Sequence, residues 1–204
     1  MFRCKRSSKN STPEMNWRLL FLGLAMLGGC VSLPSAPKPA ARPAQFEDAP
    51  FALNGRVSIK HLEIRQSAGV HWTHQAHSDE ILLLNPLGQT AARVYRDDGN
   101  ATLDEGGRHY QDADAQSLME QVLGWHLPLD GLHHWVLGMA DPGSPAQIER
   151  ADNGQISMLR QDGWEVRYLS YADANLGSMP KRMQLSHEDL QVLLLVDEWD
   201  WNPQ

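Results

Sequence analysis

The residues of this chain that could carry chemistry are first of all histidines, in two groups. His71, His74 and His77 have a spacing that invites a zinc site, but strand side chains alternate between faces, so His71 and His74 would point in opposite directions. His133 and His134 are neighbours on a predicted helix and would diverge by about 100°. The sequence also lacks the GxxxxGKS/T loop of nucleotide-binding proteins and the GxSxG elbow of hydrolases. We therefore predict no metal, no cofactor and no enzymatic activity.

Cys30 is the other residue with distinctive chemistry. It follows a basic N-terminal stretch and a short apolar run, 19–27, which is too short for the ~20 residues of a bilayer span. This pattern predicts a cleaved signal peptide over 1–29. The Leu-Gly-Gly-Cys ending at Cys30 resembles the lipobox of bacterial lipoproteins, in which the cysteine is lipidated and becomes the first mature residue. An ordinary secretory signal is the alternative, and either Met1 or Met15 could start translation.

Removal of residues 1–29 changes the charge balance of the chain. Of 18 basic and 25 acidic residues, 13 and 24 remain, which gives a net charge of −11 over 175 residues. Such an acidic domain repels nucleic acid and anionic lipid surfaces, so we expect no nucleic-acid partner. Cys4 is lost with the signal, so Cys30 has no cysteine to pair with and the fold depends on its hydrophobic core.

Residues 30–50 are predicted to form a tether between the lipidated cysteine and the folded domain. Prolines at 34, 37, 39, 43 and 50 prevent regular helix or sheet in this segment. In polyproline II form, at ~3.1 Å per residue, it would reach about 60 Å. The tether would hold the domain near a membrane without fixing its orientation.

From residue 51 onward the apolar pattern has a period of two, which predicts antiparallel strands in one domain, 51–204. A meander of about six strands is expected from the segments 51–59, 68–73, 81–84, 91–95, 101–103 and 108–110. Further strands are expected at 156–160, 164–171, 183–185 and 190–196. The last segment is apolar on both faces, which predicts a central or covered strand.

Two short amphipathic helices interrupt the strand pattern. The first is expected over 115–123, capped by Asp112 or Asp114, and ended by Gly124. The second is expected to be capped by Asp130 and stopped by Gly138, with a loop over 141–145 after it. Helices this short need a sheet to pack on, which predicts a curved antiparallel sheet with the helices across one face.

The turn Asn85-Pro86-Leu87-Gly88 carries an unusual residue. Pro86 and Gly88 suit a tight turn, but Leu87 places an apolar side chain at the most exposed point of the hairpin. One interpretation is a surface leucine folded back on its own hairpin, since single exposed apolar residues are common. The other is a side chain presented to a membrane.

Several motifs together resemble the LolB family of outer-membrane lipoprotein receptors: LLLNPLG at 82–88, PLDGLHHWVLG at 128–138 and NGQISMLRQDGWEVRY at 153–168. The resemblance covers nearly all of the mature domain. It implies a mainly β fold with short helices, an incomplete antiparallel β-barrel covered by a helical lid around a hydrophobic cavity. It also implies a function, in which the protein accepts lipoproteins from the periplasmic carrier LolA and inserts them into the outer membrane.

The resemblance also assigns roles to individual residues. Leu87, within the turn Asn85 to Gly88, matches a loop leucine needed for membrane insertion. Trp72, Trp135 and Trp164 match family tryptophans at the barrel wall or lid. The resemblance therefore implies that these three residues lie at the acyl-chain cavity. Packing as ordinary core is the alternative for each of these tryptophans.

The resemblance implies a location as well. In the family, an aspartate directly after the lipidated cysteine favours retention in the inner membrane. Here that residue is Val31, so we expect the outer membrane. The protein would be a monomer anchored by its lipid to the inner leaflet and facing the periplasm. The expected partners are LolA, triacylated lipoproteins and that leaflet. A different function remains open: a structural envelope lipoprotein that binds protein partners through a solidly packed β domain. An apolar cavity free of protein atoms would separate the two.

Overall fold

The computed structural model describes residues 49–201 and 203. The predicted signal peptide, Cys30 and nearly all of the predicted tether lie outside the described residues. The predicted folded domain, in contrast, is described almost completely.

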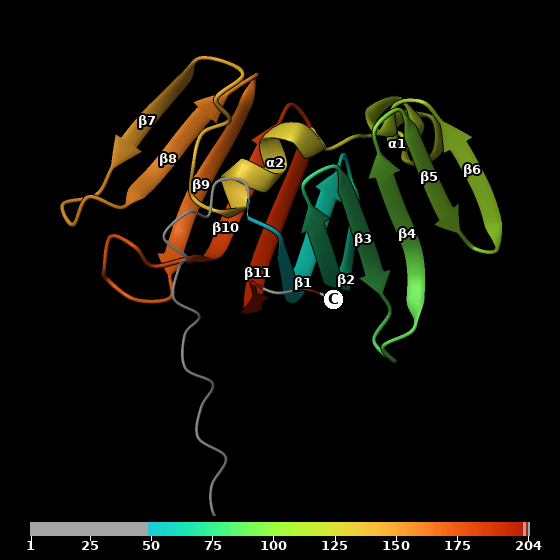
Figure 1. Ribbon diagram of the computed structural model, residues 1–204, viewed down its shortest axis with the longest axis horizontal. Coiled ribbons are helices and arrows are strands. Elements are labelled where there is room, and N and C mark those ends of the chain that lie inside the picture. The colour runs from blue at the N-terminus through green and yellow to red at the C-terminus, as the bar shows by residue number, and fades with distance from the viewer. Residues whose placement is uncertain (1–48, 202, 204) are drawn as a thin grey trace, which may run out of the picture. The chain divides into compact units, whose positions relative to one another are not determined.

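Eleven strands form one sheet in the described part of the chain (Figure 1). The strands are β1 (Phe51–His61), β2 (Ile64–Gln75), β3 (Ser78–Leu84), β4 (Thr90–Asp97), β5 (Asn100–Glu105), β6 (Arg108–Asp112), β7 (Ala146–Arg150), β8 (Ile156–Gln161), β9 (Trp164–Tyr171), β10 (Pro180–His187) and β11 (Leu190–Asp200). Their order is β6-β5-β4-β3-β2-β1-β11-β10-β9-β8-β7. The predicted six-strand meander is confirmed, and β11 is an interior strand between β1 and β10, as its apolar pattern indicated.

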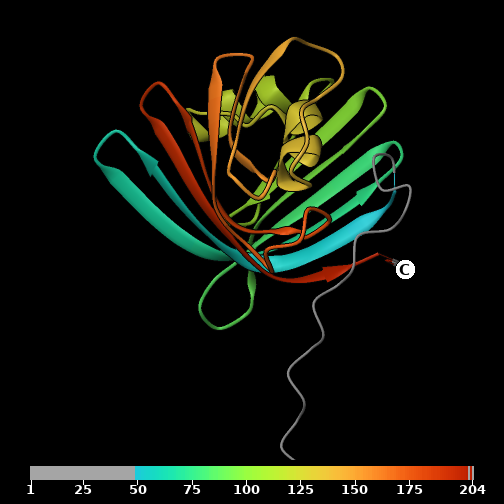
Figure 2. The same cartoon turned by 90° about the vertical axis from the view of Figure 1, so that its left-hand side faces the viewer.

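All neighbouring strands are antiparallel, and the sheet does not close, because β6 and β7 are its two edges. The sheet curves strongly around the helices (Figure 2). Part of the curvature has a local cause at Gly55, where the β1–β11 register shifts. A Cβ atom at Gly55 would lie 2.2 Å from the carbonyl oxygen of Leu195, so only glycine fits this bulge. The predicted fold, an incomplete antiparallel barrel with short helices, is confirmed.

The two helices lie between β6 and β7 in the chain. Helix α1 (Ala115–Leu123) begins as predicted, with the Asp114 carboxylate accepting a hydrogen bond from the Ser117 amide, and ends at Gly124 with φ +74°. Helix α2 (Leu129–Val136) begins earlier than predicted, with Pro128 at the cap position and no side-chain cap bond. The prediction that Asp130 caps α2 is therefore wrong. None of the helices formed by the described residues is long and apolar enough to cross a membrane.

The hydrophobic core lies between the concave face of the sheet and the helices. Inward positions alternate along each strand, for example Val57 and Ile59 on β1 and Val192 and Leu194 on β11. From the helices, Leu118 of α1 and several residues of α2 are buried in this core. The sequence predicted the helices on this face because each has one apolar side.

Candidate functional site

An apolar cavity lies between the sheet and the helices. Every side chain that lines it is apolar. The strands contribute the inward-facing residues Leu53, Val57, Ile59, Val70, Trp72, Ile81, Leu83, Val94, Leu185, Val192 and Leu194. The helices and the segment between them contribute Met119, Leu123, Trp125, Leu127, Leu129, Leu132 and Val136. Because no polar atom of its wall faces the cavity, the cavity suits hydrocarbon and offers nothing to a polar ligand.

The cavity is small in this structure because side chains fill most of it. Its volume is about 80 Å³, whereas pockets that hold drug-sized ligands have roughly 300–1,000 Å³. A long acyl chain therefore needs the wall to move. The sheet side is fixed by ladders of hydrogen bonds between strands, so the part that can be displaced belongs to the layer that covers the sheet.

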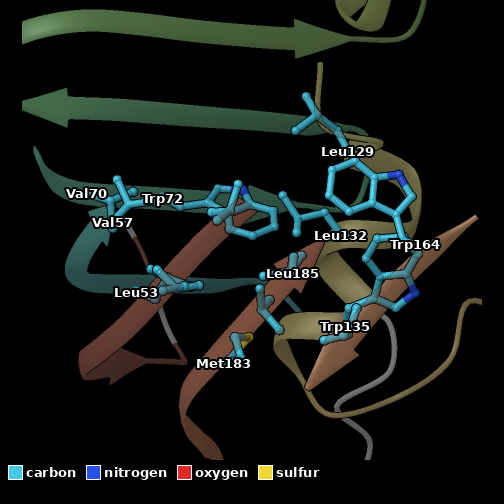
Figure 3. Packing of buried hydrophobic residues seen from close by; sticks show 14 of the residues in the cluster. Leu53, Val57, Val70, Trp72, Leu129, Leu132, Trp135, Trp164, Met183 and Leu185 are labelled. Atoms are coloured by element: carbon cyan, nitrogen blue, oxygen red, sulfur yellow. The ribbon is translucent and has the colours of Figure 1, made fainter. Parts of the chain in front are cut away.

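Trp72 stands in the wall of this cavity, on β2. Its indole Nε1 donates a hydrogen bond to the Asp79 carboxylate at 2.8 Å, which fixes the ring. Figure 3 shows it in the same core layer as Leu53, Val57 and Val70. Of the three predicted tryptophans, Trp72 is the one that lines the cavity.

Trp135 and Trp164 lie together in another part of the core. Their ring centroids are 6.1 Å apart, and Figure 3 shows the two indoles side by side. The indole of Trp135 donates to Gln161 at 2.9 Å, and its backbone carbonyl accepts a hydrogen bond from the Tyr168 hydroxyl at 2.8 Å. These contacts fasten the end of α2 to β8 and β9, so both tryptophans pack as core beside the cavity and are absent from its wall.

A buried carboxylate connects the sheet to helix α2. Asp79, on β3, is 2% exposed and accepts hydrogen bonds from Trp72, His74 and Arg96, the last at 2.7 Å. Arg96 of β4 also pairs with Asp130 of α2. The ion pairs therefore run from the sheet to the helix, and Asp130, expected as a cap, instead holds α2 to the sheet.

Electrostatics favour this network in its ionised form. Burial by itself raises the pKa of Asp79, but its hydrogen bonds with His74 and Trp72 and the positive charge of Arg96 outweigh burial and hold the pKa below its ordinary value. The sequence carries a signal for this buried residue. Asp79 shares the inward parity of Ile81 and Leu83, and an acidic side chain at a core position requires buried partners.

The histidines of the two groups in the sequence do not converge on one site. His71 hydrogen-bonds Asn54 on the outer face, and His77 lies exposed near Asp98. His74 points inward, where its ring stacks on His133 with centroids 4.6 Å apart. Among the described residues, no cluster of three or more His, Cys, Asp or Glu side chains could hold a metal ion.

His133 is held in its neutral form. Burial, together with the nearby His134 and His74, lowers its pKa to about 4. Within the described part of the chain, its buried Nδ1 has no hydrogen-bond partner. Protonation would place a charge on the face of α2 that packs against His74.

A second, polar cleft adjoins the apolar cavity. Its volume is about 460 Å³, and it lies between the end of β1, the β10–β11 turn, α1 and the segment after α1. Trp125 lines both the polar cleft and the apolar cavity. Trp125 therefore lies where the polar cleft and the apolar cavity meet.

The turn from Asn85 to Gly88 projects from the sheet on the side away from the helices (Figure 2). The Asn85 side chain accepts hydrogen bonds from the backbone amides of Leu87 and Gln89, and Gly88 has φ +78°. This network makes the turn rigid. Leu87 is 83% exposed and is the most exposed large apolar residue of the described part of the chain.

Known proteins resemble this chain over nearly the whole described domain. The family model described as "Outer membrane lipoprotein LolB" matches residues 49–199. A protein of Chromobacterium violaceum named "Outer-membrane lipoprotein LolB" is 38% identical over 184 residues, which cover 89% of this chain and 98% of the relative. A protein of the same name from Nitrosomonas europaea is 37% identical over 165 residues, or 79% of this chain and 78% of the relative.

Among solved structures, a LolA superfamily protein, NE2245 from Nitrosomonas europaea, aligns with a TM-score of 0.47 at 9% identity, over 78% of this chain and 89% of that one. The sequence relatives carry the assignment, because they match nearly the whole described domain at more than 30% identity. The chain belongs to the LolB family of outer-membrane lipoproteins.

Proposed function

We propose that this protein is an outer-membrane receptor that accepts lipoproteins from the periplasmic carrier LolA and transfers them to the membrane. The observation that carries the proposal is the cavity, whose wall consists of apolar side chains alone. The proposal contains no catalytic step. The alternative, a solidly packed structural lipoprotein, gives no reason for an apolar space enclosed by seven residues from the helices and the segment between them.

The cargo explains why such a cavity is needed. A triacylated lipoprotein carries dozens of methylenes, and each one exposed to water costs about 0.8 kcal/mol. The acyl chains therefore have to pass from one apolar site to the next. Without a nucleotide-binding motif, transfer runs downhill, with the receptor binding more tightly than the carrier and less tightly than the bilayer. A tenfold step in affinity requires only about 1.4 kcal/mol.

Loading begins with opening of the cavity at Trp125. This side chain stands between the polar cleft and the apolar cavity, so its displacement joins the two. Helix α2 is held by the Arg96–Asp130 pair and by the packing of Trp135 on Trp164. The segment between the helices and α1 therefore move, while α2 stays on the sheet.

Delivery depends on two further features of the chain. Lipidated Cys30 and the tether keep the domain at the inner leaflet of the outer membrane, facing the periplasm. Leu87, on its rigid turn, inserts into that leaflet and orients the domain for release. The protein acts as a monomer, because each step uses one cavity and one turn.

The proposal is tested by transfer of cargo between two proteins. The mature domain without its lipid is mixed with a carrier–lipoprotein complex in the absence of ATP, and affinity purification shows which protein holds the lipoprotein. Ile81→Trp, which fills the cavity wall, should accept much less cargo than wild type, whereas Ile148→Trp on the exposed edge strand β7 should accept as much. Circular dichroism verifies that both variants are folded. A wild-type domain that never acquires cargo, or that needs ATP to do so, would disprove the proposal.

A further inference from the structure

A row of outward-facing residues crosses the centre of the sheet and ends at the NPLG turn, which is residues 85–88. Arg182 of β10 pairs with Leu195 of β11, and Leu195 pairs with Arg56 of β1. The row continues from Arg56 to Gly69 of β2 and from Gly69 to Leu84 of β3. The next residue after Leu84 is the first residue of the turn. Five strands thus align two arginines with the loop that carries Leu87.

This row lies on the face opposite the cavity. The cavity is lined by Val57, Val70 and Leu194, which are sequence neighbours of residues in the row, and strand side chains alternate between faces. On the outer face the row forms the floor of an open groove of about 390 Å³, which reaches Pro86 of the turn. We call this feature the outer groove. It shares only Val57 with the wall of the apolar cavity and no residue with the polar cleft.

The outer groove combines apolar and cationic groups. Leu84, Leu193 and Leu195 are half-buried on a face that is polar in most antiparallel sheets of soluble domains. Gly69 has no side chain to fill the groove, and a Cβ there would crowd Leu84, whose Cβ would lie 3.3 Å away. Leucines beside arginines suit a ligand with hydrocarbon next to an anionic group.

The charged side chains that line the outer groove are positive, whereas the net charge of the mature chain is negative. The mature chain carries a net charge of −11, with 13 basic against 24 acidic residues, yet this groove has two guanidinium groups. Arg56 is held by the Asp197 carboxylate through hydrogen bonds of 3.0 and 3.2 Å. Arg182 is exposed, and its side chain makes no hydrogen bond or ion pair with any of the described residues. The Arg182 guanidinium is therefore available to a phosphate, which arginine binds through two parallel hydrogen bonds.

We propose that the outer groove is a phospholipid headgroup site, in which Arg182, aided by Arg56, binds a lipid phosphate while Leu87 inserts beside it. This inference rests on the proposed function, since it specifies how the domain meets the membrane. Two contact points, the inserted leucine and the bound phosphate, fix the orientation of a tethered domain, whereas one leaves it free to rotate. The cavity is on the other face, so docking does not block the route by which cargo arrives.

The contact is measured directly by solid-state NMR on the mature, lipidated protein. The protein is labelled with ¹⁵N-arginine and reconstituted in vesicles of phosphatidylethanolamine and phosphatidylglycerol. Dephasing of guanidinium ¹⁵N signals by lipid ³¹P reports arginines within contact distance of phosphate. We expect dephasing in wild type, its loss in Arg182→Gln, and no change in Arg167→Gln, which removes an exposed arginine of β9 paired with Glu165. Delivery of cargo into these vesicles should slow about fivefold in Arg182→Gln.

Two further measurements distinguish the alternatives. Wild-type protein in a phosphate-free detergent with inorganic phosphate should show no dephasing, and equal dephasing there would mean a site for free phosphate instead of a headgroup. Unchanged dephasing in Arg182→Gln would overturn the inference. Acceptance of cargo from the carrier is measured on the same samples and should be unaffected by Arg182→Gln. Failure of wild type to accept cargo would disprove the proposed function, whereas normal acceptance without dephasing would disprove the headgroup site alone.

Discussion

Replacement of Leu87 by glutamate should separate acceptance of a lipoprotein from its delivery. Full burial of a leucine side chain contributes about 1.5–3 kcal/mol, and Leu87 is 83% exposed, so nearly all of this is available on insertion into a membrane. A contribution of about 2 kcal/mol corresponds to a roughly 30-fold change in membrane partition of the turn. Glutamate removes this contribution and adds a charge that hydrocarbon rejects. The cavity is unaffected, because the turn projects on the side away from the helices.

The assay follows one labelled lipoprotein through both steps, from the carrier to the receptor and from the receptor to liposomes. Leu87→Glu should accept cargo at the wild-type level and release little of it. Leu176→Glu, which changes another exposed leucine in the loop between β9 and β10, is the matched control and should deliver normally. Equal loss of both steps in Leu87→Glu would mean that Leu87 is packed structure, and normal delivery would mean that it is an incidental surface residue.

Three other variants test the anchor and the buried network. Cys30→Ala should abolish lipidation while circular dichroism of the domain stays unchanged; an unfolded domain would contradict a purely locating role for the lipid. Asp79→Ala leaves the buried Trp72 and His74 side chains without their acceptor and leaves Arg96 with Asp130 alone, and it should lower the free energy of unfolding in denaturant by about 3–5 kcal/mol, so a loss below 1 kcal/mol would refute the network. The unfolding free energy of wild type should decrease as the pH falls from 6.5 to about 4, because the pKa of His133 is lowered in the folded state and only the unfolded imidazole binds a proton in that range. His133→Phe should flatten this pH dependence, and an unchanged pH profile would exclude His133 as its source.

Sequence patterns predicted the elements whose apolar residues face the core. The alternation along 51–59 and 164–171 and the apolar face of 115–123 identified β1, β9 and α1, because burial dictates residue type at those positions. β7 was missed because its residues 147–150 are exposed, so no alternation marks them. The start of β2 was missed for the same reason, since residues 64–67 extend past the core and remain exposed.

The candidate site was predictable only in part. The exposure of Leu87 followed from its place in a tight turn, which is a local property. Trp72 lines the cavity, whereas Trp135 and Trp164 pack together in the core. This difference depends on which strands face α2, and no local sequence pattern contains that information. The role of Asp130 was missed for a related reason, because its carboxylate binds Arg96, a residue 34 positions away in the chain.

The central claim is that acyl chains occupy the cavity beneath the helices, and the most direct measurement is the position of a labelled chain in the loaded protein. A lipoprotein with a spin label on one acyl chain is transferred to the receptor, and paramagnetic broadening of methyl signals is recorded by NMR. The account predicts strong broadening at Val70 and Leu132 in the cavity wall and little at Leu169, which is exposed on β9. Broadening at Leu169 with sharp signals at Val70 and Leu132 would show that the chain binds outside the cavity and would contradict the account.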